Sequence, residues 1–201
     1  MCQAVKIIIS CVIGYLLGSA NSSLIVGKFY GVDVRKHGSG NAGATNTLRT
    51  LGKAAALFVT LGDVLKGITA CLIGSFIGGG DGLMAAGIAA IIGHNWPLYF
   101  RFRGGKGVLT SFAVVIMMDW KAALILFAVF LAVVVFTRYI SLGSVVSAAL
   151  FPLVAYLDNG KNRLYVILAF VLGLLVVVRH RSNIIRIYQG TESKFGLKKS
   201  A

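Results

Sequence analysis

Long apolar runs separated by short polar segments dominate this chain of 201 residues. A helix crosses the hydrocarbon layer of a membrane, about 30 Å thick, in about 20 residues. The apolar candidate runs are Ala4–Val26, Ala54–Ile77, Leu83–Phe100, Val108–Met118, Trp120–Thr137, Ile140–Leu157 and Leu164–Val178. The pattern therefore predicts an all-α integral membrane protein with about seven transmembrane helices. Because the run Val108–Met118 is short, five full spans plus re-entrant segments are the alternative.

The distribution of Lys and Arg predicts the orientation of these spans. With seven crossings, most basic residues fall in loops on one face, and the other face receives only Lys6, Lys121, Lys161 and Arg163. Cytoplasmic loops carry the excess of Lys and Arg. We therefore expect the N-terminus outside and the C-terminus in the cytoplasm, and the five-span alternative keeps these sides. The N-terminal run loosely imitates a cleavable signal peptide, but an uncleaved first helix is the better interpretation because further apolar runs follow.

The composition supports a lipid environment and excludes several classes of protein. Hydrophobic residues make up 57% of the chain and charged residues only 13%, with a mean hydropathy of +0.85, whereas soluble domains average about 25% charged residues. The net charge of +14 could suggest nucleic acid, but it clusters in short loops between apolar runs, so we expect no nucleic-acid partner. Cys2, Cys11 and Cys71 form no CxxC pair, and no metal set or cofactor is expected. No linker divides the chain, which predicts a single membrane-embedded domain over residues 1–201.

The first polar motif runs from Arg35 to Arg49. Its residues 38–43 match G-x-G-x-x-G, but a dinucleotide site needs this pattern in a βαβ unit, and the surrounding sequence is membrane-helical. Glycines nevertheless let backbone N–H groups approach an anion. The candidate phosphate-binding residues here are Gly38, Ser39, Gly40, Asn41, Thr45, Asn46 and Arg49. An ordinary polar loop made flexible by glycine is the alternative.

The second motif joins Gly93-His94-Asn95-Trp96-Pro97 to Arg103-Gly104-Gly105-Lys106-Gly107. Gly104 and Gly105 free the backbone just before a helix N-terminus, where the helix dipole favours anions. Lys106 adds a positive charge, so these three residues are candidates for phosphate binding. Positive-inside topology explains Arg101 and Arg103, and a structural role is preferred for His94.

Two further pairs and one buried pair complete the candidates. Ser141 and Ser144 share a helix face, although small residues at this spacing often serve only close helix packing. His180 and Asn183 share a face at the end of the last span, where an interfacial role is an equal alternative. Asp63 and Lys66 lie inside the second span, where charges are costly and usually paired. A structural ion pair is the default interpretation, and orientation of a phosphate ligand is the rival.

Acidic residues are too few for carboxylate or magnesium chemistry. The chain has six of them, and only Asp33 and Glu192 fall on the predicted cytoplasmic side. A site in these loops must therefore handle phosphate charge with backbone amides, Arg and Lys.

Together the motifs resemble one family. GSGNAGATN followed by Arg49, GHNWP followed by RGGKG, YISLGS, and RHRSN followed by QGTE are similar to the bacterial membrane acyl-phosphate:glycerol-3-phosphate acyltransferases, the PlsY family. The similarity covers essentially the whole chain, with the motifs in order and at comparable spacing.

The resemblance implies that the protein moves a fatty acyl group from acyl phosphate to the 1-hydroxyl of glycerol 3-phosphate, giving 1-acyl-glycerol 3-phosphate (lysophosphatidic acid) and phosphate for phospholipid synthesis. It implies a multi-pass protein of the bacterial cytoplasmic (inner) membrane with its active site on the cytoplasmic face. Phosphate binding is carried over to the residues of the first two motifs. The reacting region is carried over to Ser144, His180 and Asn183, with Ser141 second. Whether an enzyme that supplies acyl phosphate docks on the loops is left open.

Two questions stay open at this stage. The proton of the hydroxyl could pass to His180 or to the phosphate of the acyl donor, and we favour the phosphate, with His180 and Asn183 positioning groups. A transporter for a phosphorylated solute is the rival class, but it predicts polar sites near the membrane midplane and on both faces. The polar motifs of this chain fall on one face, which favours an enzyme at the membrane surface.

Overall fold

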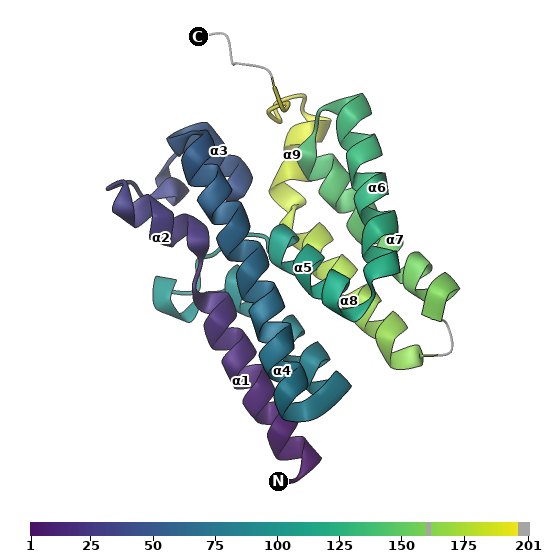
Figure 1. The fold of residues 1–201 in the computed structure, drawn as a ribbon. Coiled ribbons are helices and arrows are strands. Elements are labelled where there is room, and N and C mark those ends of the chain that lie inside the picture. Colours follow the sequence, from purple (N-terminus) through teal and green to yellow (C-terminus); the bar gives the residue numbers. More distant parts are fainter. Residues whose placement is uncertain (160–161, 197–201) are drawn as a thin grey trace. The chain divides into compact units, whose positions relative to one another are not determined.

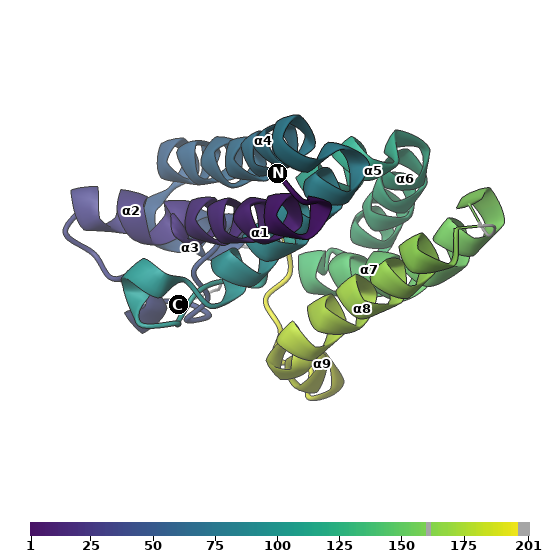
Figure 2. The ribbon, with the colours of Figure 1, turned by 90° about the horizontal axis from the view of Figure 1, so that it is seen from below.

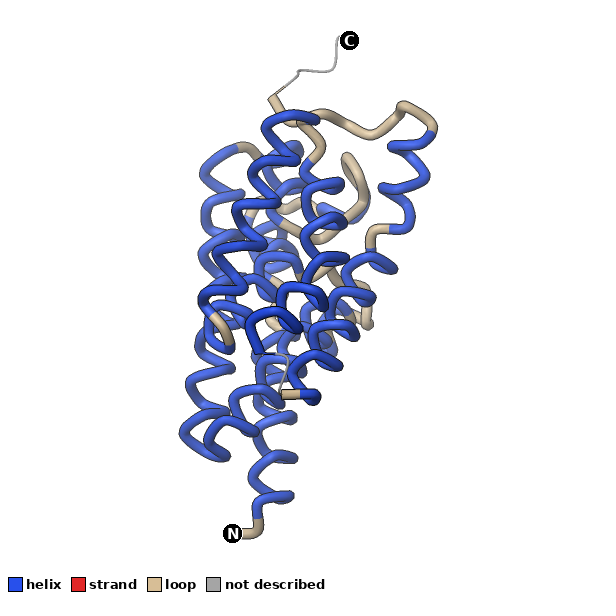
Figure 3. The backbone as a smooth tube through the Cα atoms, turned by 90° about the vertical axis from the view of Figure 1, so that its right-hand side faces the viewer, coloured by secondary structure: helices blue, strands red, loops and turns tan. Residues whose placement is uncertain are grey.

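The computed structural model describes residues 1–159 and 162–196. Lys161, Lys198 and Lys199, which contribute to the predicted charge asymmetry, lie outside these residues. Within the described part, the regular elements are helices (Figure 3). The chain forms two compact units, Met1–Met118 and Asp119–Ala201, and each is described by itself. That the whole chain acts as one domain stays a prediction.

Unit 1 contains α1 (Gln3–Ser19), α2 (Ser22–Phe29), η1 (Val34–Lys36), α3 (Ala44–Leu51), α4 (Lys53–Asn95), η2 (Leu98–Phe100) and α5 (Val108–Met118). The apolar run Ala4–Val26, expected to be one helix, is divided between α1 and α2. Asn21 causes the division because its side chain accepts from the Leu24 amide at 3.1 Å and caps α2.

Helix α4 is a hairpin of two antiparallel arms. Gly79 takes φ 64° and ψ −145°, a conformation that is essentially restricted to glycine. Beyond this turn the arms lie so close that a Cβ on Gly74 would clash with the Gly82 backbone. The predicted runs Ala54–Ile77 and Leu83–Phe100 thus correspond to the two arms of α4. The second arm ends at Asn95 rather than at Phe100, as the run had suggested, because Pro97 cannot continue the helix.

Helix α1 lies along the second arm of α4 (Figures 1 and 2). A Cβ on Gly14 would clash with the Ala86 backbone, and one on Gly18 with the Ala90 backbone. Such small residues let helix backbones approach closely where lipid gives helices no hydrophobic reason to associate. This contact sets the position of the His94 end of the second arm.

Unit 2 contains α6 (Trp120–Thr137), α7 (Ile140–Asn159), α8 (Arg163–Arg179) and α9 (Arg181–Tyr188). Helix α7 packs against both α6 and α8. The Ser147 hydroxyl donates to the Leu126 carbonyl at 3.0 Å, and Gly173 lies directly against the Ala148 carbonyl. At the start of α6, Asp119 caps the helix and accepts from the Tyr165 hydroxyl at 3.1 Å.

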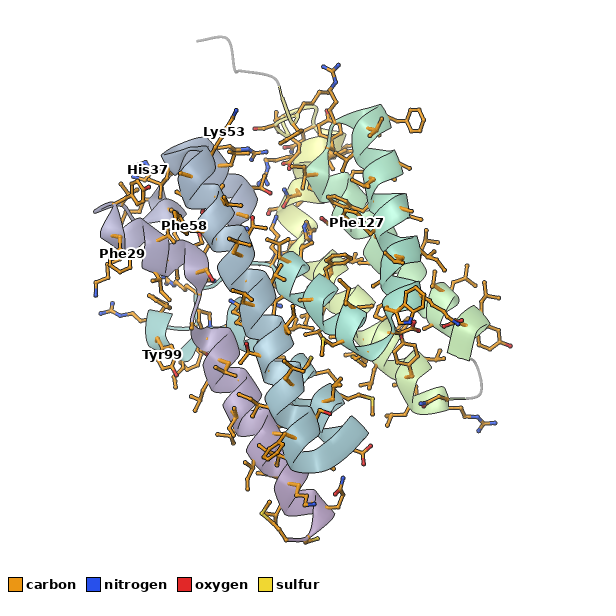
Figure 4. The ribbon with its side chains drawn as sticks, viewed as in Figure 1. Phe29, His37, Lys53, Phe58, Tyr99 and Phe127 are labelled. Carbon is orange, nitrogen blue, oxygen red and sulfur yellow. The ribbon has the colours of Figure 1, made fainter. Side chains whose placement is uncertain are left out.

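The described helices are those of a multi-pass membrane protein. Four stretches are long and apolar enough to cross a membrane, with α1 and α2 counted as one stretch and both arms of α4 as another; the number is five if α8 and α9, bent by 55°, form one span. Large apolar side chains cover the outside of the helices, among them Phe29 and Phe58, which are 85% and 61% exposed (Figure 4). Such surfaces are stable in lipid and not in water. The span count and the sides on which the termini lie stay predictions.

Candidate functional site

The side chain of Asn46 holds the backbone of the first glycine-rich segment in shape. Its side-chain oxygen accepts from the Ser39 amide at 2.8 Å, and its amide nitrogen donates to the carbonyls of Val34 at 2.8 Å and His37 at 3.0 Å. The side chain is buried, and a Cβ on Gly38 (φ 59°) would clash with its oxygen. Asn46 was expected to contact phosphate. In the structure its amide instead holds the loop in shape.

The other predicted residues of this segment are more accessible than Asn46. Gly38, Ser39, Gly40 and Arg49 are exposed, whereas Asn41 and Thr45 are half-buried. Gly40 has φ 71°, in the left-handed region that favours glycine. Helix α3 begins directly after this turn, so the loop presents polar groups at a helix N-terminus, where the dipole favours anions.

The second glycine-rich segment packs against the first within unit 1. The Gly105 amide donates to the His94 carbonyl at 3.2 Å, and a Cβ on Gly105 would clash with both the Ala42 carbonyl and the His94 ring. A Cβ on Gly104 would likewise clash with the His94 carbonyl and with Pro97. Lys106, which follows, is half-buried. The structure therefore brings two motifs that are far apart in sequence into one region.

Arg35 bridges the same two segments. Its guanidinium pairs with Asp33 at 2.9 Å and donates to the carbonyls of Phe100 at 3.4 Å and Arg103 at 3.3 Å. The hydrogen bond from Arg35 lowers the pKa of the Asp33 carboxyl, which stays ionised near neutral pH. His37 and Lys53 lie at the α3 end of the same unit (Figure 4). Arg35 thus links the two adjoining loops.

Beneath these loops, Asp63, Lys66 and His94 form a buried cluster between the two arms of α4. Lys66 Nζ lies 2.8 Å from Asp63 Oδ1 and 2.8 Å from His94 Nδ1, and His94 Nδ1 lies 3.5 Å from Asp63 Oδ1. Thr110 on α5 donates to the Asp63 carbonyl at 3.1 Å. The ion pair was expected from its spacing. The participation of His94 was not, because the register across the Gly79 turn determines it.

Unit 2 gathers a different set of residues around Glu192. Ser141 Oγ and Asn183 Nδ2 donate to its Oε1 at 2.8 Å and 2.6 Å, and Arg186 Nε donates to its Oε2 at 2.7 Å. Burial alone would raise the pKa of Glu192, but the hydrogen bonds from Arg186, Asn183 and Ser141 outweigh it and lower the pKa. Sequence reasoning had not selected Glu192 as a site residue. Two signals were present: its place in QGTE, and its being one of two acids on the predicted cytoplasmic side.

His180 and Ser144 are also buried in unit 2. His180 Nδ1 lies 2.8 Å from the Val176 carbonyl, and because a carbonyl only accepts, Nδ1 carries the proton. In the neutral ring Nε2 is then an acceptor, as a base or a hydroxyl-orienting group requires. The Ser144 hydroxyl donates to the Ile140 carbonyl of its own helix at 3.0 Å. Ser141 and Asn183 are therefore joined through Glu192, while Ser144 is bonded within α7.

The described residues contain no group of three or more His, Cys, Asp or Glu side chains that could hold a metal ion. The fold and its apolar helices define a multi-pass α-helical membrane protein. A model of the family described as glycerol-3-phosphate acyltransferase matches residues 8–190. The chain belongs to this glycerol-3-phosphate acyltransferase family, and the resemblance seen in the motifs is confirmed.

Relatives of known sequence and structure agree over almost the full length. The chain is 44% identical over 192 residues to a glycerol-3-phosphate acyltransferase of Thermoanaerobacter sp. (strain X514), covering 95% of this chain and 96% of the relative. It is 47% identical over 199 residues to that of Clostridioides difficile (strain 630), with 96% and 97% covered. A crystal structure of PlsY (YgiH), an integral membrane glycerol 3-phosphate acyltransferase in its glycerol 3-phosphate form, superposes with a TM-score of 0.88 at 38% identity, covering 94% of this chain and 96% of the other.

Proposed function

We propose that this protein transfers a fatty acyl group from acyl phosphate to the 1-hydroxyl of glycerol 3-phosphate. The products are 1-acyl-glycerol 3-phosphate and inorganic phosphate. Membership of the acyltransferase family supports the reaction class. Similar solved structures, of an enzyme in its glycerol 3-phosphate form and in its lysophosphatidic acid form, support the acceptor and the product. The acyl phosphate donor is the part that rests on the motif resemblance and on the chemistry of the loops.

The observation that carries the proposal is the joining of two basic, glycine-rich loops in unit 1. Both substrates carry a phosphate group, and exposed amides with Arg and Lys are the groups that bind phosphate without a metal. Arg35 and the close contact between Gly105 and Ala42 hold the loops together. We assign phosphate binding to the side chains and backbone amides of Gly38, Ser39, Gly40, Asn41, Thr45, Arg49, Gly104, Gly105 and Lys106. Asn46 supports the first loop through its hydrogen bonds to the backbone of Val34, His37 and Ser39.

Acyl phosphate is a mixed anhydride with a good leaving group, so positioning and charge stabilisation can supply much of the catalysis. The hydroxyl oxygen forms the new bond to the acyl carbon, and the bond from that carbon to the phosphate oxygen breaks. Phosphate leaves with the electron pair of the broken bond. The hydroxyl proton passes to the departing phosphate, while His180 Nε2 and Asn183 orient the reacting groups. Direct proton transfer to His180 is the alternative, because the same nitrogen is an acceptor in the neutral ring.

A serine acyl-enzyme is disfavoured by the hydrogen bonds of both serines. Ser144 donates to the Ile140 carbonyl, and Ser141 donates to Glu192; neither bond forms the Ser–His–Asp arrangement that activates a serine nucleophile. Trapping an acyl group on either serine, detected by mass spectrometry, would overturn direct transfer. We further propose that the loops face the cytoplasm of a bacterial inner membrane, where an enzyme that makes acyl phosphate can supply the donor.

The test uses purified protein in detergent or in a lipid cubic phase, with palmitoyl phosphate and glycerol 3-phosphate. Phosphate release and lysophosphatidic acid are followed together, and palmitoyl-CoA serves as the control donor. Lys106→Ala should lose activity through weaker phosphate binding, whereas Lys121→Ala, a change at an exposed lysine at the start of α6, should keep it. Product from acyl phosphate alone supports the proposal. Absence of product with both donors, in folded wild-type protein, would contradict it and favour a transporter, for which solute flux is the assay.

A further inference from the structure

The Lys66 ammonium is surrounded by three acceptors inside unit 1. Its Nζ forms an ion pair with Asp63 Oδ1 at 2.8 Å, lies 2.8 Å from His94 Nδ1 and donates to the Ala20 carbonyl at 3.3 Å. Lys66 is 8% exposed, and Asp63 and His94 are 2% exposed each. An ammonium group has three N–H donors and no acceptor. The ammonium can therefore only donate to the His94 ring nitrogen that it contacts.

These contacts determine the tautomer of His94. Because Lys66 can only donate, Nδ1 of His94 must accept, and it carries no proton. The proton of the neutral ring then lies on Nε2, which makes this nitrogen a donor. His180 has the opposite arrangement, since its Nδ1 donates to the Val176 carbonyl. The two buried histidines of the chain thus present opposite hydrogen-bonding groups at Nε2.

His94 holds the second glycine-rich loop from two sides. Its backbone carbonyl accepts from the Gly105 amide at 3.2 Å. Its ring nitrogen Nε2 lies so close to Gly105 that any Cβ there would clash with it, and the Ala42 carbonyl lies on the same side. Gly105 is thereby enclosed between the His94 ring and the first loop, directly before Lys106.

We propose that Asp63, Lys66 and His94 are positioning residues for phosphate binding by the loop Gly104–Gly107. The ion pair holds His94 in the Nε2–H tautomer and in one ring orientation, and the ring supports Gly105 and so places the Lys106 charge. This inference rests on the proposed function and adds residues that act through the loop rather than on the substrate.

The rival explanation is an ion pair that only stabilises the hairpin. A buried ion pair is weak evidence for stability, since replacing both partners by uncharged residues is often neutral, whereas removing one leaves an unpaired buried charge. The two explanations therefore differ in one variant. Changing both charges together, Asp63→Asn with Lys66→Met, keeps similar shapes and leaves no unpaired charge, but it removes the donor to His94 Nδ1.

The experiment compares this double variant with His94→Leu, His94→Gln and wild type. The Gln amide nitrogen can occupy the place of Nε2–H, so His94→Gln is the conservative rescue. Asp119→Asn is the matched control, because it neutralises a buried carboxylate at the α6 N-cap, where Asn caps as well as Asp. For each protein the melting temperature, kcat and the KM values of both phosphate substrates are measured. The shift in melting temperature produced by glycerol 3-phosphate or by inorganic phosphate is measured as well.

We expect the double variant and His94→Leu to remain folded and to raise the KM of at least one phosphate substrate roughly tenfold, since a displacement of about 1 Å can cost about a hundredfold in rate. The kcat should change less, His94→Gln should recover part of the loss, and Asp119→Asn should match wild type. A folded double variant with wild-type KM values and a wild-type phosphate shift would overturn the inference. If wild type makes no product, the proposed function fails separately, and the phosphate-induced shifts alone decide the inference.

Discussion

The side-chain amide of Asn183 donates a hydrogen bond of 2.6 Å to Glu192 Oε1, the same oxygen that accepts from Ser141 at 2.8 Å. Because an ionised carboxylate only accepts, the Asn183 amide nitrogen must face Glu192 and its oxygen must face away. One carboxylate after α9 thus sets the orientation of residues on α7 and α9. Two candidate residues of the reacting region are therefore positioned by a third that touches both.

Glu192→Gln should destabilise the protein. The carboxylate accepts three side-chain hydrogen bonds, and a hydrogen bond to a charged group contributes about 1.5–3 kcal/mol. Because the Arg186 side chain is 31% exposed, we expect a total loss of only about 2 kcal/mol. That loss corresponds to a melting temperature lower by roughly 4–8 °C for a chain of this size. Thermal unfolding in detergent measures it, with Gln189→Ala, a change at an exposed neighbour, as the control; an unchanged melting temperature for Glu192→Gln would contradict the role.

The same carboxylate makes stability depend on pH in a defined direction. Its folded-state pKa is lowered below the ordinary value of 4.5, so the folded state binds the proton less readily than the unfolded state. The stabilisation is then fully present above about pH 4.5 and is lost as the pH falls through the lowered pKa. The difference in melting temperature between wild type and Glu192→Gln should be constant between about pH 5 and 7 and should shrink in more acidic buffer. A difference that grows on acidification would show that the pKa is raised instead.

Gly105→Ala should impair activity more than stability. The added Cβ would clash with His94 Nε2 and the Ala42 carbonyl, so the loop must shift and move Lys106 with it. We expect kcat/KM to fall roughly tenfold or more. Gly80→Ala is the matched control because a Cβ there meets open space at the α4 turn, and it should change stability by no more than about 0.5 kcal/mol. Equal kinetics for the two variants would show that the contact between Gly105 and His94 does not position Lys106.

The two buried histidines should show opposite tautomers in solution. The chain has three histidines, His37, His94 and His180, so single substitutions assign each signal in a ¹⁵N-histidine NMR spectrum. For neutral rings we expect the proton of His94 on Nε2 and that of His180 on Nδ1, because their Nδ1 partners are a donor and an acceptor respectively. The Asp63→Asn, Lys66→Met variant should change the His94 signals and leave those of His180 alone. A wild-type His94 with its proton on Nδ1 would contradict the contact with Lys66.

Much of the fold could be predicted from the sequence because helices and membrane spans depend on local composition. The helix Val108–Met118 was located to the residue, and the arms of α4 and the helices of unit 2 followed their apolar runs. Capping and turn chemistry altered the boundaries, as Asn21 divides the first run and Pro97 ends the second arm. The family, too, could be recognised from the order and spacing of local motifs, which need no three-dimensional information.

The sequence by itself determined which segments are helical, which loops are basic and rich in glycine, and to which family the chain belongs. Only the tertiary structure decided which side chains meet. The Gly79 turn sets the register that places His94 opposite Asp63 and Lys66, the chain after α9 returns Glu192 to Asn183, and burial makes Asn46 a support of its loop. The His94 contact joins residues that are 28 positions apart in the chain, and the other two depend on how a loop folds back onto the neighbouring helix. No local pattern encodes either kind of contact, because both depend on how helices pack and where the chain turns.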